Sequence, residues 1–136
     1  MDELGNAALL RTAYESLAAG DPGPVLHAFA PDGVLHIANG VFVGDHVGAE
    51  AISRVLGGLF EWTAGTLRLD VEEIFADETH GVVLLRESGT RATDGAELDV
   101  RETHLLRIDG GLVTEFWDLP AEAGREAHDA FFSETS

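Results

Sequence analysis

Glu102, His104 and Asp118 are the residues whose types and spacing best suit proton-transfer chemistry in this chain. Glu102 and His104 are two positions apart, so on a β-strand their side chains point to the same face. The segment Asp109-Gly110-Gly111 separates them from Asp118, and an Asp-Gly pair between two strand-like runs predicts a hairpin. Asp118 is therefore expected on an adjoining antiparallel strand. Two carboxylates and an imidazole arranged in this way can exchange protons near neutral pH.

Each of these residues also has a structural interpretation. Asp118 is suited to end a strand before Leu119-Pro120, and Glu102 and His104 can satisfy each other on an inner face. A glutamate that only orients His104 would give the same pattern, so Glu102 is predicted as a supporting residue. If Asp118 lies under apolar cover, burial is expected to raise its basicity.

A second group of residues is expected to surround the first. His36 lies on a predicted strand and is a candidate third polar group of a pocket, or else a buried, hydrogen-bonded histidine. Tyr14 lies on the apolar stripe of the first predicted helix, so its hydroxyl either reaches the pocket or stays in the core. Phe42, Phe60 and Trp62 are candidates for apolar lining, although a plain core position is the commoner role for each of them alone.

Other polar and aromatic residues are given structural roles. Trp117 alternates with Asp118, which predicts that it lies on the outer face or at a dimer interface. Arg86 is expected to pair with Glu102 or with an acidic residue of a neighbouring strand. The remaining histidines belong to no motif and are expected to be exposed; they are His27, His46, His80 and His128.

Composition narrows the class of protein. A length of 136 residues predicts one domain over residues 1–136. The net charge of −17 comes from 25 acidic residues and eight arginines without lysine, which disfavours binding to nucleic acid or to anionic membranes. There is no cysteine, no apolar run of the ~20 residues that span a bilayer, and no positively charged signal region. These features predict a cytoplasmic protein without disulfides.

Metal, phosphate and serine-nucleophile motifs are absent from the sequence. No close ligand pair such as His-x-x-x-His occurs, so neither a metal nor an organic cofactor is expected. Gly57-Gly58 is not followed by the residues of a phosphate-binding loop, and no Gly-x-Ser-x-Gly elbow occurs.

Periodicity and turn residues predict an α+β order of elements. Helices are expected over 3–19, 23–29, 47–59 and 121–132, the third of them capped by Asp45. A short strand over 34–38 is expected to turn at Asn39-Gly40 into a return strand over 41–43. Four longer strands over 66–76, 80–91, 97–108 and 112–119 predict an antiparallel meander. Together these elements predict a curved, mostly antiparallel sheet with helices covering one side.

This layout and several motifs resemble the SnoaL-like polyketide cyclases, within the superfamily that includes ketosteroid isomerase and nuclear transport factor 2. The resemblance covers nearly the whole chain. The motifs that carry it are Phe29-Ala30-Pro31-Asp32-Gly33-Val34-Leu35-His36, Gly65-Thr66-Leu67-Arg68, Arg107-Ile108-Asp109-Gly110-Gly111 and Glu115-Phe116-Trp117-Asp118, together with Gly44 before the third helix.

The resemblance implies a cone-shaped α+β barrel with a pocket between the sheet and the helices, commonly as a homodimer and without a cofactor. It implies that Asp118 acts as acid/base in an aldol-type ring closure, with His104 and the polar position Glu102 beside it and His36 further along. Ile37 occupies the position of the ketosteroid-isomerase base, which disfavours that reaction.

The function expected from the residues and the resemblance is acid/base chemistry on a small apolar carbonyl or polyketide-like compound. The alternatives are a non-catalytic pocket protein of the same fold and, with less support, a protein-interaction domain.

Overall fold

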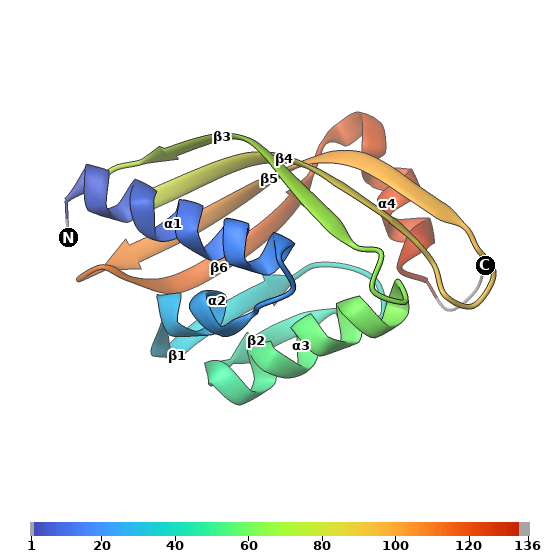
Figure 1. Cartoon of the computed structure of the whole chain (residues 1–136), viewed down its shortest axis with the longest axis horizontal. Coiled ribbons are helices and arrows are strands. Elements are labelled where there is room, and N and C mark those ends of the chain that lie inside the picture. Colours follow the sequence, from blue (N-terminus) through green and yellow to red (C-terminus); the bar gives the residue numbers. More distant parts are fainter. Residues whose placement is uncertain (1, 134–136) are drawn as a thin grey trace.

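The computed structural model describes residues 2–133, which form an α+β fold (Figure 1). Two helices come first, α1 over Glu3–Ala18 and α2 over Gly23–Ala28. Strands β1 (Phe29–Ile37) and β2 (Gly44–Val47) then lead into helix α3 (Gly48–Trp62). The remaining elements are β3 (Arg68–Ala76), β4 (His80–Thr90), β5 (Glu97–Asp109), β6 (Leu112–Pro120), a 3-10 turn η1 (Glu122–Gly124) and helix α4 (Arg125–Phe131).

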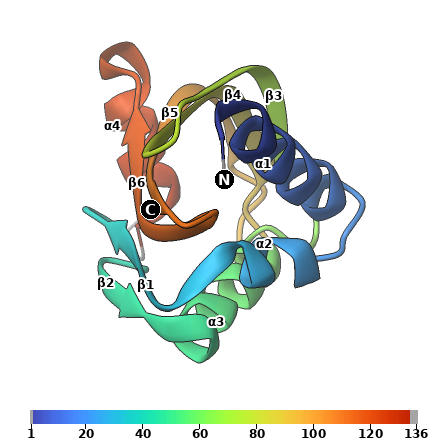
Figure 2. The same ribbon diagram turned by 90° about the vertical axis from the view of Figure 1, so that its left-hand side faces the viewer.

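The strands form one sheet in the order β2-β1-β6-β5-β4-β3. All neighbours are antiparallel except β1 and β6, which run parallel. The sheet curves around the helices without closing, because β2 and β3 remain as its two edges (Figure 2). The cone-shaped barrel implied by the resemblance is therefore an open, curved sheet, and the predicted α+β class is confirmed.

The concave face of the sheet holds the core. Helix α1 packs along β3 and places Leu10 against Val83 and Ile108, while α3 packs on β1 through Ile52 and Val55. Helix α4 lies against the first half of β5, where Phe131 and Phe132 join a separate apolar cluster with Leu98 and Val100. The strands that carry the candidate site thus have a helix over each end of their inner face.

Local sequence explains where these elements begin and turn. The Asp2 carboxylate accepts a hydrogen bond from the Gly5 amide at 2.8 Å and begins α1. Gly110 and Gly111 both have positive φ, at 58° and 80°, the backbone conformation that a tight hairpin requires between β5 and β6.

The predicted elements differ from the structure mainly before α3. The return strand is Gly44–Val47 rather than 41–43, so that prediction is wrong. Asp45 does not cap α3, because it lies within β2 and its carboxylate bonds to the His36 ring instead. Among residues 2–133, no helix is both long and apolar enough to cross a membrane.

Candidate functional site

The β5–β6 hairpin brings His104 and Asp118 together. The two residues are direct partners in the antiparallel register, and His104 Nε2 lies 3.6 Å from Asp118 Oδ1. Glu102 lies on the same face of β5, with Oε1 3.8 Å from that nitrogen. Glu102 and His104 are buried, whereas Asp118 keeps a small exposed fraction. The structure therefore brings together the three residues with which the sequence argument began.

Tyr14 extends this group from helix α1. Its hydroxyl lies 2.5 Å from His104 Nδ1, and the two rings are stacked. One nitrogen of His104 thus faces a phenol and the other faces carboxylates. Because a protonated imidazole donates from both nitrogens, the Tyr14 oxygen can accept from Nδ1 while its own proton stays available.

Two further ionisable residues, Glu87 and His128, complete the cluster and were not expected there. His128 Nε2 lies 3.5 Å from Glu87 Oε1, 3.3 Å from Glu102 Oε2 and 3.7 Å from Asp118 Oδ2. The prediction that His128 is exposed is wrong, because α4 turns it into the core beside Phe132. The sequence held a signal for both residues. Glu87 alternates with Val83 and Leu85 on the inner face of β4, and His128 shares an apolar helix stripe with Phe131 and Phe132.

The charges of the cluster balance through burial and pairing. Burial alone would raise the pKa of Asp118, but pairing with His104 and His128 outweighs it and holds the pKa below its usual range. Burial opposes charge on the two imidazoles as well. The carboxylates of Asp118 and Glu102 nevertheless raise the pKa of His128 to about 11, and Tyr14 together with the same carboxylates raises the pKa of His104 well above its usual range. The expectation that burial makes Asp118 more basic is therefore wrong, because its two imidazole partners decide the direction of its pKa shift.

The pKa values of Glu87 and Tyr14 are both raised above their usual ranges. Burial, and then the charges of Glu102 and Asp118, raise the pKa of Glu87 well above its usual range. Burial likewise raises the pKa of Tyr14. The site therefore offers a neutral proton donor, the Tyr14 hydroxyl, beside the ionised Asp118.

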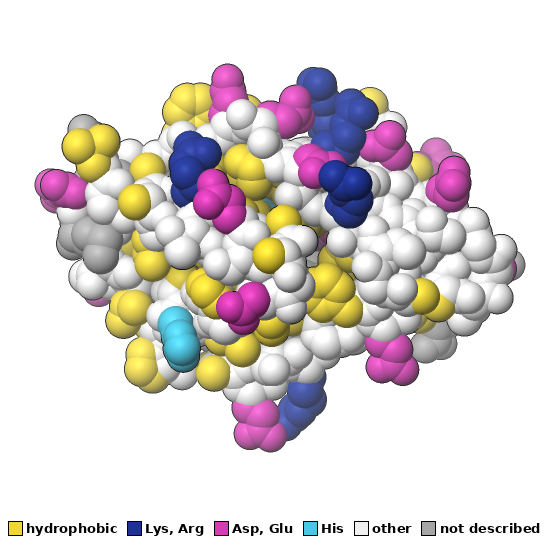
Figure 3. Space-filling view, in the orientation of Figure 1, with side chains coloured by type: hydrophobic (Ala, Val, Ile, Leu, Met, Phe, Trp, Pro, Cys, Tyr) yellow, Lys and Arg dark blue, Asp and Glu magenta, His cyan; other side chains and the backbone are white. Residues whose placement is uncertain are grey.

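An apolar cavity of about 110 Å³ opens onto this cluster. It is of the same order as the cavity of roughly 150 Å³ that admits benzene in an engineered protein core. Tyr14, Glu87, His104 and Asp118 form its polar end. Apolar side chains from the helices and the sheet form the rest, among them Leu10, Leu35, Ile52, Val55, Phe60 and Phe116. On the face that Figure 3 shows, hydrophobic side chains gather between helices α1 and α2 and helix α3.

The structure places His36 away from this cavity. Leu35 and Ile37 line the cavity, so His36, which alternates with them, points to the opposite face of β1. There its ring bonds Asp45 at 2.8 Å and Glu115 at 2.9 Å. The hydrogen bond to Asp45 raises the pKa of His36, although burial opposes the shift. The prediction that His36 belongs to the catalytic group is wrong on this geometry.

Two of the four expected lining residues also lie elsewhere. Tyr14 and Phe60 contact the cavity, whereas Phe42 and Trp62 pack on the aromatic cluster under α4. The Trp62 indole Nε1 donates a hydrogen bond to the Phe131 carbonyl at 3.0 Å. Both residues are thus core residues that pack against α4, which is the alternative role that the sequence left open for them.

The other residues that the sequence singled out have the following positions. Arg86 pairs across the strands with Asp99 at 3.5 Å, not with Glu102. Trp117 stacks on the His36 ring, as expected for a side chain on the outer face. His27 and His80 are exposed, as expected, and His46 is half-buried.

Two groups of described side chains have the donor types and spacing that a metal ion needs. Glu87, Glu102 and His128 form one group; Glu102, His104 and Asp118 form the other. Within each, the ligand atoms lie within 4.8 Å of one another.

Comparison with known proteins agrees with the fold. Residues 10–116 match the SnoaL-like domain family. The chain therefore belongs to the SnoaL-like family. In its structure a curved sheet surrounds an apolar pocket with a polar end. A search of curated protein sequences finds no match.

Solved structures share the fold at low sequence identity. Bal32a, from a soil-derived mobile gene cassette, is 23% identical with a TM-score of 0.86, over 96% of this chain and 98% of that one. An NTF2-like protein of unknown function from Burkholderia pseudomallei K96243 is 22% identical with a TM-score of 0.80, over 92% and 97%. A protein described as a SnoaL-like polyketide cyclase from Jannaschia sp. CCS1 is 18% identical with a TM-score of 0.78, over 98% and 95%.

Proposed function

We propose that this protein is a cofactor-independent acid/base catalyst that acts on a small apolar carbonyl compound. One observation carries the proposal: a proton acceptor, Asp118, and a neutral proton donor, Tyr14, meet at the polar end of an otherwise apolar cavity. Membership of a family with polyketide-cyclase relatives supports the same substrate class.

The reaction step that the geometry supports is removal of a proton from a carbon next to a carbonyl. Asp118 Oδ1 is buried without a hydrogen-bond partner among the described residues and lies at the cavity, so it is the atom placed to take the proton. The C–H electrons then move into the carbonyl to give an enolate, whose oxygen accepts a hydrogen bond from the Tyr14 hydroxyl. His104 supports both groups, because it contacts the Tyr14 oxygen with Nδ1 and lies beside Asp118 with Nε2.

The state of Asp118 restricts the substrate. A carboxylate whose pKa is held low is always ionised but is a weak base. The carbon acid must therefore already be activated, as a carbon between two carbonyls is. That requirement favours β-dicarbonyl compounds of polyketide type over simple ketones, and the enolate that forms can attack a second carbonyl of the same molecule in an aldol ring closure.

Exchange of solvent deuterium into such a carbon tests the proposal. Ethyl 2-methylacetoacetate, a small β-keto ester, serves as the probe, and nuclear magnetic resonance records loss of its α-proton against buffer at the same pH. The wild type is expected to accelerate exchange, and Asp118→Asn to remove about 10²–10⁴-fold of the acceleration. Retained acceleration in Asp118→Asn excludes Asp118 as the base. Exposed Asp32→Asn is the matched control and should change nothing.

The same low basicity of Asp118 also favours the alternative, a non-catalytic pocket protein. That function predicts thermal stabilisation by the β-keto ester in both wild type and Asp118→Asn, without accelerated exchange in either. The two functions are thus separated by one pair of measurements on one pair of proteins. The expected homodimer and cytoplasmic location remain proposals.

A further inference from the structure

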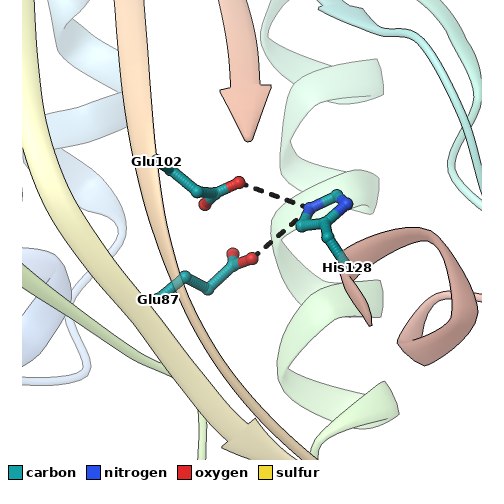
Figure 4. Close-up of side chains that lie close together, drawn as sticks. All are labelled: Glu87, Glu102 and His128. Atoms are coloured by element: carbon teal, nitrogen blue, oxygen red, sulfur yellow. Dashed lines mark ion pairs between the residues drawn. The ribbon is translucent and has the colours of Figure 1, made fainter. Parts of the chain in front are cut away.

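A second group of side chains converges behind the polar end of the cavity. Glu87 comes from β4, Glu102 from β5 and His128 from α4, and the three point at one another (Figure 4). Their side chains are 7%, 0% and 8% exposed, respectively. Because all three are more than nine-tenths buried, water at the protein surface does not satisfy them.

Hydrogen bonds within the group do not satisfy these atoms. Glu87 Oε1 and both carboxylate oxygens of Glu102 are buried without a hydrogen-bond partner among the described residues. Glu87 Oε1 and Glu102 Oε2 lie 3.5 and 3.3 Å from His128 Nε2 as ion pairs. Buried polar atoms that are left in this state are costly. Two carboxylate oxygens and one imidazole nitrogen therefore face one another within 4.8 Å without hydrogen bonds.

The spacing of these three atoms fits a tetrahedral ion. Zinc binds nitrogen and oxygen ligands at about 2.0–2.1 Å, which sets neighbouring ligand atoms of a tetrahedron about 3.4 Å apart. The distances from His128 Nε2 to Glu87 Oε1 and to Glu102 Oε2 are 3.5 and 3.3 Å. Asp118 Oδ2, at 3.7 Å from the same nitrogen, borders a fourth position. A divalent ion would also neutralise the two carboxylates of Glu87 and Glu102.

The outer nitrogen of His128 has the partner that a metal-binding histidine needs. Its Nδ1 lies 3.3 Å from the Asp129 carboxylate, which leaves Nε2 directed into the group. Metal-binding histidines usually donate their other ring N–H to a carboxylate, because this fixes the tautomer and strengthens the ligand. An acidic cluster alone would not indicate an ion, but here the unsatisfied buried oxygens, the spacing and the oriented imidazole agree.

We propose that Glu87 Oε1, Glu102 Oε2 and His128 Nε2 bind one divalent transition-metal ion of the zinc class and that the ion holds α4 against the sheet. An imidazole with two carboxylates suits zinc-class ions, whereas magnesium prefers octahedral oxygen ligands. The three ligands come from separate elements, which is why no ligand motif is visible in the sequence. This site is additional to the proposed acid/base function, which uses the cavity side of the cluster.

Metal binding by the whole chain tests this proposal. Chelator-stripped protein is dialysed against ZnCl₂, and mass spectrometry counts the bound ion; one Zn²⁺ per chain is expected. Zn²⁺ should raise the melting temperature, and an equal concentration of Mg²⁺ should not. Co²⁺ in place of Zn²⁺ should give the intense visible absorption of tetrahedral coordination, a readout that needs no variant.

Variants identify the ligands. Glu87→Gln and His128→Gln should weaken Zn²⁺ binding by more than about 100-fold, and Asp129→Asn by about 10-fold. His27→Gln and His80→Gln, at exposed positions, are the matched controls and should bind as the wild type does. Circular dichroism checks that each variant is folded. The absence of stoichiometric Zn²⁺ in the wild type, octahedral Co²⁺ spectra, or equal losses in the His27 control would each overturn the proposal. The acid/base proposal is tested by deuterium exchange in metal-stripped protein, and the metal proposal is tested by Zn²⁺ binding. Either proposal can therefore fail without the other.

Discussion

Replacing Tyr14 by phenylalanine is expected to destabilise the protein although it removes a single oxygen. Tyr14 is buried against Leu10 and Leu85, and phenylalanine keeps this ring packing. The substitution therefore isolates the hydroxyl, which lies 2.5 Å from His104 Nδ1 and is buried. The loss leaves a buried imidazole nitrogen without its partner.

The expected magnitude follows from the charge of that partner. Hydrogen bonds to charged groups contribute about 1.5–3 kcal/mol, compared with about 1 kcal/mol for neutral pairs. The carboxylates beside Nε2 favour the charged imidazole of His104, so the range for charged groups applies. We expect the free energy of unfolding to fall by about 2 kcal/mol. In a domain of this size each kcal/mol shifts the melting temperature by roughly 3–5 °C, so a fall of about 6–10 °C is expected.

Urea unfolding of four proteins tests this reasoning: wild type, Tyr14→Phe, His104→Gln and the double variant. The midpoint should fall in Tyr14→Phe while the m-value stays unchanged. The coupling energy between the two positions should be about 1.5–3 kcal/mol, because the residues contact each other directly. A coupling energy below about 0.5 kcal/mol would refute the charge-assisted bond, even if each single variant were destabilised.

Two further predictions concern α3 and the outer face of β1. Gly57→Ala should stabilise the protein by about 0.5–1 kcal/mol, because α3 gains a better helix former and nothing lies within 4 Å of the new carbon. The neighbouring Gly58→Ala should destabilise by about 1 kcal/mol, because its carbon would lie 2.6 Å from the Phe42 ring; equal urea midpoints for the two variants would contradict the placement of Phe42. The pKa of His36 is raised by its bond to Asp45, so its stabilisation is complete below about pH 6.5 and is lost as pH rises through the folded-state pKa. Unfolding free energies between pH 6 and 9 should therefore converge for wild type and His36→Gln as pH rises, and a constant difference would show that this ion pair is not responsible.

Local rules were sufficient to predict most of the fold. Alternation and Asp-Gly turns predicted the β3–β6 meander to within a few residues, because each hairpin is formed by neighbouring segments. The short β1–β2 hairpin was misplaced, since its register depends on contacts with α3 and on the bond between His36 and Asp45 rather than on Asn39-Gly40. Where pairing is decided by distant contacts, turn residues are a weak guide.

The candidate site was predictable only where strand parity could be followed. Parity placed Glu102 and His104 on one face and Trp117 opposite Asp118 correctly. The same rule, applied to Glu87, would have placed it with Val83 and Leu85, but a single acid on an apolar face is also a common surface feature at a strand end. For His36, parity alone left open which face of β1 would meet the helices. The neighbours Leu35 and Ile37 decide it, because the larger apolar residues go inside.

The order of the elements has a consequence for folding kinetics. Glu87, Glu102, His104 and Asp118 all belong to the meander, so short-range hairpins bring three carboxyl groups together early. The parallel pairing of β1 with β6 must instead close a loop around the whole meander, and such long-range contacts form slowly. Helix α4 adds His128 from outside the meander. In the partly folded meander these carboxylates repel one another before His128 packs against them. We therefore expect the rate of folding to rise as pH is lowered toward protonation of the carboxylates.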